Sequence, residues 1–185
     1  TSDYKSSSII NHNLQIDSNL VSNIRYAIAG PINIMEYNGQ PEIRSWVIHL
    51  WGVNFETTDS DDYKILYANP GGLNVETYFE RQLDILNMIV ESAKYARGKE
   101  GVDHVKIQMP MIGMGQFLKA IPLKAQEACQ LLFIEAISKV LSSNSDISLK
   151  LCIYTPNDFS NNCLERLGDL SEKFPVFSLG LGQEN

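Results

Sequence analysis

Two glycines lie between a strand-like segment and a helix-like segment in "VKIQMPMIGMGQFLKAIP", residues 105–122. Apolar residues alternate up to Pro110, Gly113 and Gly115 follow, and Pro122 suits the first position of a helix. A glycine-bearing turn after the carboxyl end of a strand presents backbone N–H groups that can bind an anion such as phosphate. The segment lacks the third glycine of a dinucleotide-binding fingerprint and the Lys-Ser or Lys-Thr of a P-loop. The spacing therefore indicates either an anion-binding loop or an ordinary tight turn.

Acidic side chains are the second source of candidate chemistry. Glu76 and Glu80 are one helical turn apart and could act as paired carboxylates, although a place near a helix N-terminus explains them as well. The stretch "TTDSDD" (residues 57–62) lacks the full calcium-loop pattern, and we interpret it as a solvated acidic loop. His49 lies between apolar residues, which favours a hydrogen-bonded strand residue over a catalytic base. The three histidines have no ligand spacing, so no metal site is expected.

The composition limits the classes of protein that the chain can belong to. Its 185 residues are 44% hydrophobic and 20% charged, which indicates one globular domain. A formal charge of −7 without a basic cluster argues against binding to nucleic acid or to anionic membranes. Cys129, Cys152 and Cys163 have no CxxC spacing, which predicts reduced intracellular thiols. With no apolar run of membrane-spanning length and no signal-peptide layout, we expect a cytoplasmic location, or the host cytosol for a secreted effector.

Periodicity predicts strands and helices in alternation around the glycine loop. Residues 1–15 are rich in Ser and Asn and are expected to be poorly ordered, and residues 17–29 have the pattern of a short helix. The clearest helix covers residues 75–97, where apolar side chains recur every three or four residues after a cap at Asn74. The other predicted elements are strands at 32–37, 45–53, 104–109, 147–155 and 175–179, and helices at 122–141 and within 157–174. This order indicates an α/β fold with a parallel sheet and right-handed crossovers.

Two of these strands carry further expectations. The segment "SWVIHLWGV" (residues 45–53) is a near-continuous apolar run, which predicts a strand covered on both faces of a sheet. Its aromatic residues Trp46 and Trp51 are expected in the core. The segment "PVFSL" (residues 175–179) is short and follows the last helix, and we expect it at the edge of the sheet.

The stretch "VKIQMPMIGMGQFLKAIPLKAQEACQLLFIEAISKVL" resembles the second phosphate loop and following helix of macrodomains and of the related poly(ADP-ribose) glycohydrolases. "WVIHLWGVN" is similar to the family's Ile-His strand, "YFERQLDILNMIVESAKYA" stands in the place of the next helix, and "LKLCIYTPNDF" resembles a late strand. The resemblance covers residues 46–159 and implies a three-layer α/β/α fold with a mixed, mostly parallel sheet. Residues 16–185 would form a single macro-like domain. Residues 1–45 lack the family's early motifs, so the chain is either part of a longer protein or a divergent relative with a rebuilt front half.

The resemblance also implies a ligand, ADP-ribose or an ADP-ribosylated protein, and residues to bind it. The loop backbone would surround the diphosphate and distal ribose at Ile112, Gly113, Met114, Gly115, Gln116 and Phe117. Tyr154 or Asn157, at the end of the late strand, would contact adenine or its ribose. In a hydrolase, Glu76 or Glu80 beside Asn69 would assist the attack of water at the anomeric carbon of the ribose.

Three functions from different classes are compatible with these residues. The chain could be an enzyme that removes ADP-ribose from proteins, a module that binds ADP-ribose or a related nucleotide, or a macro-like domain that binds proteins without a ligand. The loop is visible in the sequence and a catalytic set is not, which favours binding over chemistry. No cofactor is expected, and the oligomeric state stays open. A bulky residue at Gly113 or Gly115 should abolish binding, with little change in melting temperature where φ is negative.

Overall fold

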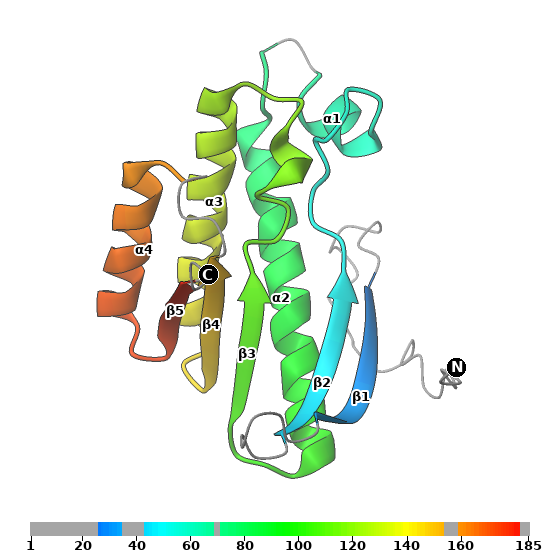
Figure 1. Cartoon of the computed structure of the whole chain (residues 1–185), viewed down its shortest axis with the longest axis vertical. Coiled ribbons are helices and arrows are strands. Elements are labelled where there is room, and N and C mark those ends of the chain that lie inside the picture. Colours follow the sequence, from blue (N-terminus) through cyan, green and yellow to red (C-terminus); the bar gives the residue numbers. More distant parts are fainter. Residues whose placement is uncertain (1–25, 35–42, 69–70, 154–158, 182–185) are drawn as a thin grey trace.

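The computed structural model describes residues 26–34, 43–68, 71–153 and 159–181 of the chain. Figure 1 shows its elements along the sequence. They are β1 (Tyr26–Ile34), β2 (Ile43–Leu50), α1 (Asp61–Leu66), α2 (Val75–Glu100), β3 (Val105–Pro110), the 3-10 helix η1 (Gln116–Leu118), α3 (Leu123–Ser142), β4 (Ile147–Ile153), α4 (Asn161–Lys173) and β5 (Phe177–Leu181). The predicted α/β class is therefore confirmed.

The strands form two separate sheets. β3, β4 and β5 form a parallel sheet with β4 in the centre, in which Val105 lies opposite Ile147 and Leu149 opposite Phe177. The predicted parallel sheet and the edge position of the last strand are confirmed. β1 and β2 pair with each other in an antiparallel hairpin. Within the described residues, this hairpin shares no ladder with the parallel sheet.

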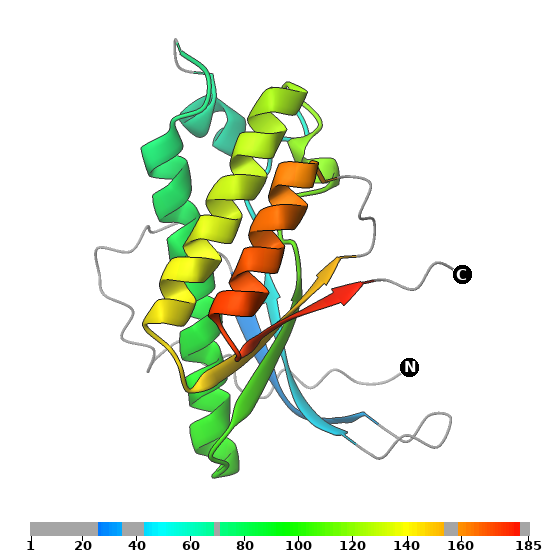
Figure 2. The ribbon, with the colours of Figure 1, turned by 90° about the vertical axis from the view of Figure 1, so that its left-hand side faces the viewer.

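The helices α2, α3 and α4 all lie on one face of the strands (Figure 2). The burial of β3 alternates accordingly, because Ile107 and Met109 are buried whereas Lys106 and Gln108 are exposed. The described residues thus form one helical layer against one strand layer. A second helical layer, which the three-layer arrangement requires, is not among the described residues.

Local signals explain where the helices begin and end. The Asn74 side chain accepts a hydrogen bond from the Thr77 amide at 3.2 Å and caps α2, which ends at Gly101 with φ of 64°. Pro122 precedes the first turn of α3, and Ser160 caps α4 by accepting from the Cys163 amide at 3.2 Å. The predicted helices at 75–97 and 122–141 are confirmed within a few residues.

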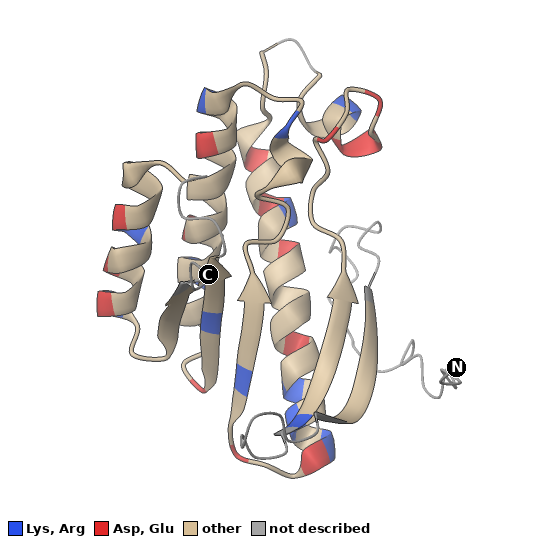
Figure 3. Ribbon diagram, viewed as in Figure 1, with Lys and Arg blue, Asp and Glu red and all other residues tan. Residues whose placement is uncertain are grey.

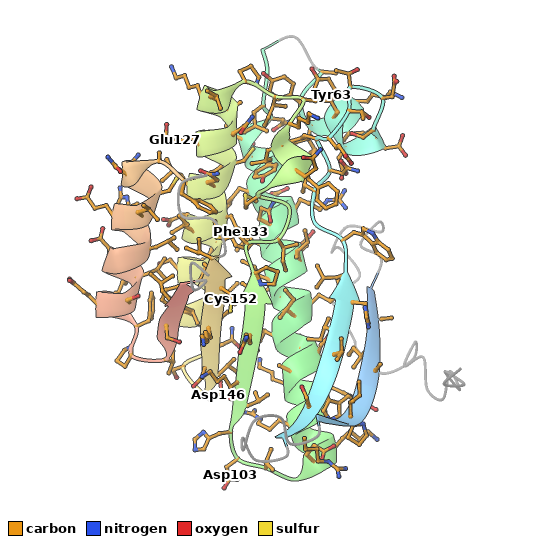
Figure 4. The ribbon with its side chains drawn as sticks, viewed as in Figure 1. Tyr63, Asp103, Glu127, Phe133, Asp146 and Cys152 are labelled. Atoms are coloured by element: carbon orange, nitrogen blue, oxygen red, sulfur yellow. The ribbon has the colours of Figure 1, made fainter. Side chains whose placement is uncertain are left out.

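One hydrophobic core fills the space between the helices and the parallel sheet. Figure 4 places its buried Phe133 near the middle of the molecule. Each such side chain contributes about 1.5–3 kcal/mol when it leaves water. The largest fully buried side chains are Phe55, Leu66, Tyr78, Ile85, Leu86, Leu118, Phe133, Ile137, Ile147, Leu151, Ile153 and Leu167. None of the described helices is both long and apolar enough to cross a membrane.

The N-terminal part differs from the prediction. Residues 26–29, predicted as the end of a helix, belong to β1, because they pair with residues 47–50 of β2. The expectation that β2 is covered on both faces is wrong, since its described side chains are half-buried or exposed. Trp46 is half-buried, and Trp51 is 66% exposed just after the end of β2, so it is no core residue. Residues 1–15 and 17–25 lie outside the described residues.

Candidate functional site

The glycine loop lies where the sequence placed it, at the carboxyl end of β3. Pro110 pairs with Cys152, so the carboxyl ends of β3 and β4 reach the same edge of the sheet. The loop then turns, with the Met114 amide donating to the Met111 carbonyl at 3.2 Å, and continues through η1 to α3 (Figure 1). In open α/β sheets, this edge is where ligands usually bind.

Gly113 is a glycine because two backbone segments meet there. Its φ is +76°, and a Cβ atom at this position would lie 3.0 Å from the Val53 carbonyl oxygen. On the facing segment, a Cβ atom at Gly52 would lie 2.9 Å from the Gly113 amide nitrogen. Gly113 therefore allows the loop to pack closely against the segment that follows β2. Little change in melting temperature is expected for a bulky residue only where φ is negative. Because φ of Gly113 is positive, that expectation does not apply to Gly113.

The segment after β2 holds the loop with two backbone hydrogen bonds. The Phe55 amide donates to the Phe117 carbonyl at 2.6 Å, and the Ala120 amide donates to the Phe55 carbonyl at 2.8 Å. The buried Phe55 ring fixes this segment by stacking on Tyr78 of α2, with 5.9 Å between ring centroids. Val53 and Phe55, which come far earlier in the chain than the loop, thus set its conformation, and no local sequence pattern signals these contacts.

The second half of the loop is open. Gly115 is exposed, and a Cβ atom there would meet nothing within 4 Å. Among the described residues, no carbonyl or side chain accepts a hydrogen bond from the amides of Gly115, Gln116 and Phe117. Three consecutive donors at the edge of a parallel sheet could bind the oxygens of an anion.

The side chains of the loop take different roles from its backbone. Met114 is buried in the core, and Ile112 and Phe117 are half-buried. Gln116 is exposed and donates from Nε2 to the Glu56 carboxylate at 3.4 Å. A carboxylate therefore lies beside the exposed end of the loop, and no local sequence pattern indicates it, because Glu56 is 60 residues from Gln116.

The acidic segment 56–62 is organised by hydrogen bonds within the protein. Asp62 accepts from the Asn54 amide at 2.8 Å, and Ser60 caps α1 by accepting from the Tyr63 amide at 3.2 Å. Figure 3 shows acidic residues gathered in and before α1, whereas the charged residues of β3, β4 and β5 are the lysines Lys106 and Lys150. Within the described part of the chain, no three His, Cys, Asp or Glu side chains are grouped so as to hold a metal ion.

The structure does not bring the proposed catalytic carboxylates to the loop. Glu76 and Glu80 are exposed in the first turns of α2, on a different side of the helix from the buried Tyr78. Neither carboxylate forms a side-chain hydrogen bond or an ion pair with another described residue. His49 is exposed on β2. Asn69, Tyr154 and Asn157, expected at the ligand, lie outside the described residues.

Two of the three cysteines, Cys129 and Cys163, are poor nucleophiles. Cys129, Cys152 and Cys163 are free and buried. Burial raises the pKa of the Cys129 thiol to about 12, and burial also raises the pKa of Cys163. Because the thiolate is the reactive form, both thiols are unreactive at neutral pH.

Comparison with protein-family models, with curated proteins and with solved structures finds no match to this chain.

Proposed function

We propose that the loop at the carboxyl end of β3 binds the diphosphate of ADP-ribose or of a related nucleotide. The observation that carries the proposal is the run of open amides at Gly115, Gln116 and Phe117, which have no acceptor among the described residues. Their place beside the carboxyl ends of β3 and β4, and the free space at Gly115, support it. As part of the same proposal, the complete domain would have the three-layer α/β/α arrangement of macrodomains.

The binding would depend on backbone donors more than on charged side chains. The residues of the loop itself are uncharged, and the Glu56 carboxylate near Gln116 opposes an anion. A bound diphosphate would take up the three amides and would gain from Gln116 turning from Glu56 toward the ligand. Because Gly113 already packs against Val53, the part of the loop that contacts the ligand starts at Gly115.

Calorimetric titration with ADP-ribose tests the proposal, using Gly115→Leu as the variant. We expect heat of binding with the wild type and none with Gly115→Leu, because the new side chain occupies the approach to the amides while contacting no protein atom at its Cβ. Gly98→Leu is the matched control, since Gly98 is also open and lies near the far end of α2. It should bind like the wild type.

Two results would reject the proposal. No heat with the wild type at millimolar ADP-ribose leaves the alternative of a macro-like fold that contacts proteins without a ligand. Equal binding by Gly115→Leu and the wild type would place the ligand elsewhere. Inorganic pyrophosphate, titrated in parallel, shows whether the diphosphate alone is recognised.

Hydrolysis of ADP-ribose linkages is a separate question, because Glu76 and Glu80 are exposed and make no bond to the loop. Incubation of an ADP-ribosylated protein with the wild type, with Glu76→Ala and with Glu80→Ala separates a reader from a hydrolase. Release by the wild type that both variants retain would remove these two residues from the reaction while leaving binding intact.

A further inference from the structure

Four buried side-chain polar atoms of α2 have no hydrogen-bond partner among the described residues, and three of them belong to two neighbouring side chains, whereas the fourth is the Ser92 hydroxyl farther along the helix. The three are the Tyr78 hydroxyl and the Oε1 and Nε2 atoms of Gln82. Both side chains are 0% exposed. Because the residues are four positions apart on one helix, the two side chains lie on the same face, one turn apart.

This face of α2 packs against α3, and Figures 1 and 2 show the two helices side by side. Burial raises the pKa of the Tyr78 hydroxyl well above its ordinary value; the nearby Cys129 of α3, itself fully buried, raises this pKa further, whereas Gln82 lowers it. The Tyr78 ring stacks on Phe55, whose backbone is hydrogen-bonded to the glycine loop. The Tyr78 hydroxyl and the Gln82 amide atoms are buried and do not contact bulk solvent.

Leaving these atoms unbonded would be costly. A buried amide or hydroxyl without a partner costs about 1–3 kcal/mol, and three such atoms would consume much of a total stability of about 5–15 kcal/mol. Buried polar groups of this kind are normally satisfied by an internal water, which makes about three hydrogen bonds. Tyr78 and Gln82 together offer three donor hydrogens, one on the hydroxyl and two on the amide nitrogen, and two acceptor oxygens.

A second buried glutamine, Gln130, has a hydrogen-bond partner within the protein. Gln130 of α3 is 4% exposed and accepts a hydrogen bond from the Cys163 thiol at 3.4 Å. There, the protein itself supplies a partner. The Gln82 side chain lies near the Tyr78 hydroxyl, but neither its oxygen nor its nitrogen has a hydrogen-bond partner among the described residues.

We propose that at least one water molecule binds between α2 and α3, accepting hydrogen bonds from Tyr78 and Gln82 and donating to the Gln82 carbonyl oxygen. The site is internal and separate from the open amides of the glycine loop, so it stands whether or not the loop binds a nucleotide. The site is connected to the glycine loop by two contacts: Tyr78 stacks on Phe55, and the Phe55 backbone is hydrogen-bonded to Phe117 and Ala120.

Magnetisation transfer from water to the Gln82 side-chain amide tests the site in solution by nuclear magnetic resonance. We expect a contact with a long-lived water in the wild type, at an amide that has no exposure to bulk solvent. Gln130→Met is the matched control, because it removes a buried glutamine whose partner is the Cys163 thiol. It should leave the water contact at Gln82 unchanged. Absence of the contact in the wild type would overturn the proposal.

A crystal structure of the wild type at high resolution gives a second test that needs no variant. Density for a water within about 3.2 Å of the Tyr78 hydroxyl and of the Gln82 amide would support the site. A direct hydrogen bond between Tyr78 and Gln82 with no such density would overturn it. In a crystal of Gln82→Met, which keeps the shape of the side chain without its polar atoms, we expect the water to be lost.

Discussion

Gly113 and Gly115 are two residues apart, yet a side chain would meet different surroundings at each. We predict that Gly113→Ala destabilises the protein by at least about 1–2 kcal/mol, because a left-handed φ costs an alanine that much before any contact with Val53 is counted. Thermal unfolding should show a decrease in melting temperature of about 2–8 °C for a chain of this size. Gly115→Ala is the comparison variant and should lower stability less than Gly113→Ala, because φ is −103° and a Cβ atom there meets no protein atom within 4 Å. Equal melting temperatures for the two variants would contradict this account of Gly113.

At the scale of elements, three interactions of Trp46 and Arg44 join the β1–β2 hairpin to the last turns of α2. Trp46 of β2 donates from Nε1 to the Glu100 carboxylate at 2.9 Å and packs its ring edge-on against Tyr95, at 6.1 Å between centroids. Arg44 forms an ion pair with the same carboxylate. The Trp46 hydrogen bond, together with Arg44, lowers the pKa of Glu100 below its ordinary value of 4.5.

A pH dependence follows from this lowered pKa. A carboxyl with a lower pKa in the folded state adds stability above its unfolded pKa, and this contribution is lost as the pH falls through the folded pKa. We predict that Glu100→Gln lowers the melting temperature at neutral pH, and that the difference from wild type shrinks below about pH 4. Glu135→Gln, at an exposed position on α3, is the control. A difference for Glu100→Gln that stays constant from pH 7 to pH 3 would contradict the role of the charge.

The elements also show which features the sequence could predict. The helices α2 and α3 and the strands β3 and β4 follow from periodicity and from signals such as Asn74 and Pro122, because each pattern is local. Residues 26–29 have a helical pattern but form β1, since pairing with β2 outweighs propensity and cannot be read from a short window. The helix α1 was missed because it has six residues, although its cap at Ser60 and the acids after it were a signal.

The candidate site also has features that the sequence could predict and features that it could not. The loop and its place after β3 were predictable, because glycine, proline and the preceding strand are contiguous. The packing of Gly113 on Val53, the two hydrogen bonds of Phe55 and the approach of Glu56 to Gln116 were not, because they depend on the path of a distant segment. The first part of the predicted glycine loop, at Gly113, thus packs against another segment, whereas the second part, from Gly115 to Phe117, has backbone amides without an acceptor among the described residues.

The molecule as a whole consists of one core and one attached hairpin, and this division predicts uneven stability. The core between α2, α3, α4 and the parallel sheet holds most of the buried apolar side chains, whereas Ile28, the buried hydrophobic residue of β1, lies outside it. Segments with few buried contacts open at a free energy below that of global unfolding. We therefore predict that native-state hydrogen exchange is faster for the amides of β1 and β2 than for those of β4, by about tenfold or more.

Two tryptophan variants test this prediction. Trp46→Ala should accelerate exchange in the hairpin and leave β4 nearly unchanged, whereas Trp51→Ala, at an exposed position next to the hairpin, should alter neither. Equal protection of the hairpin and β4 would instead mean that the two sheets unfold as a single unit.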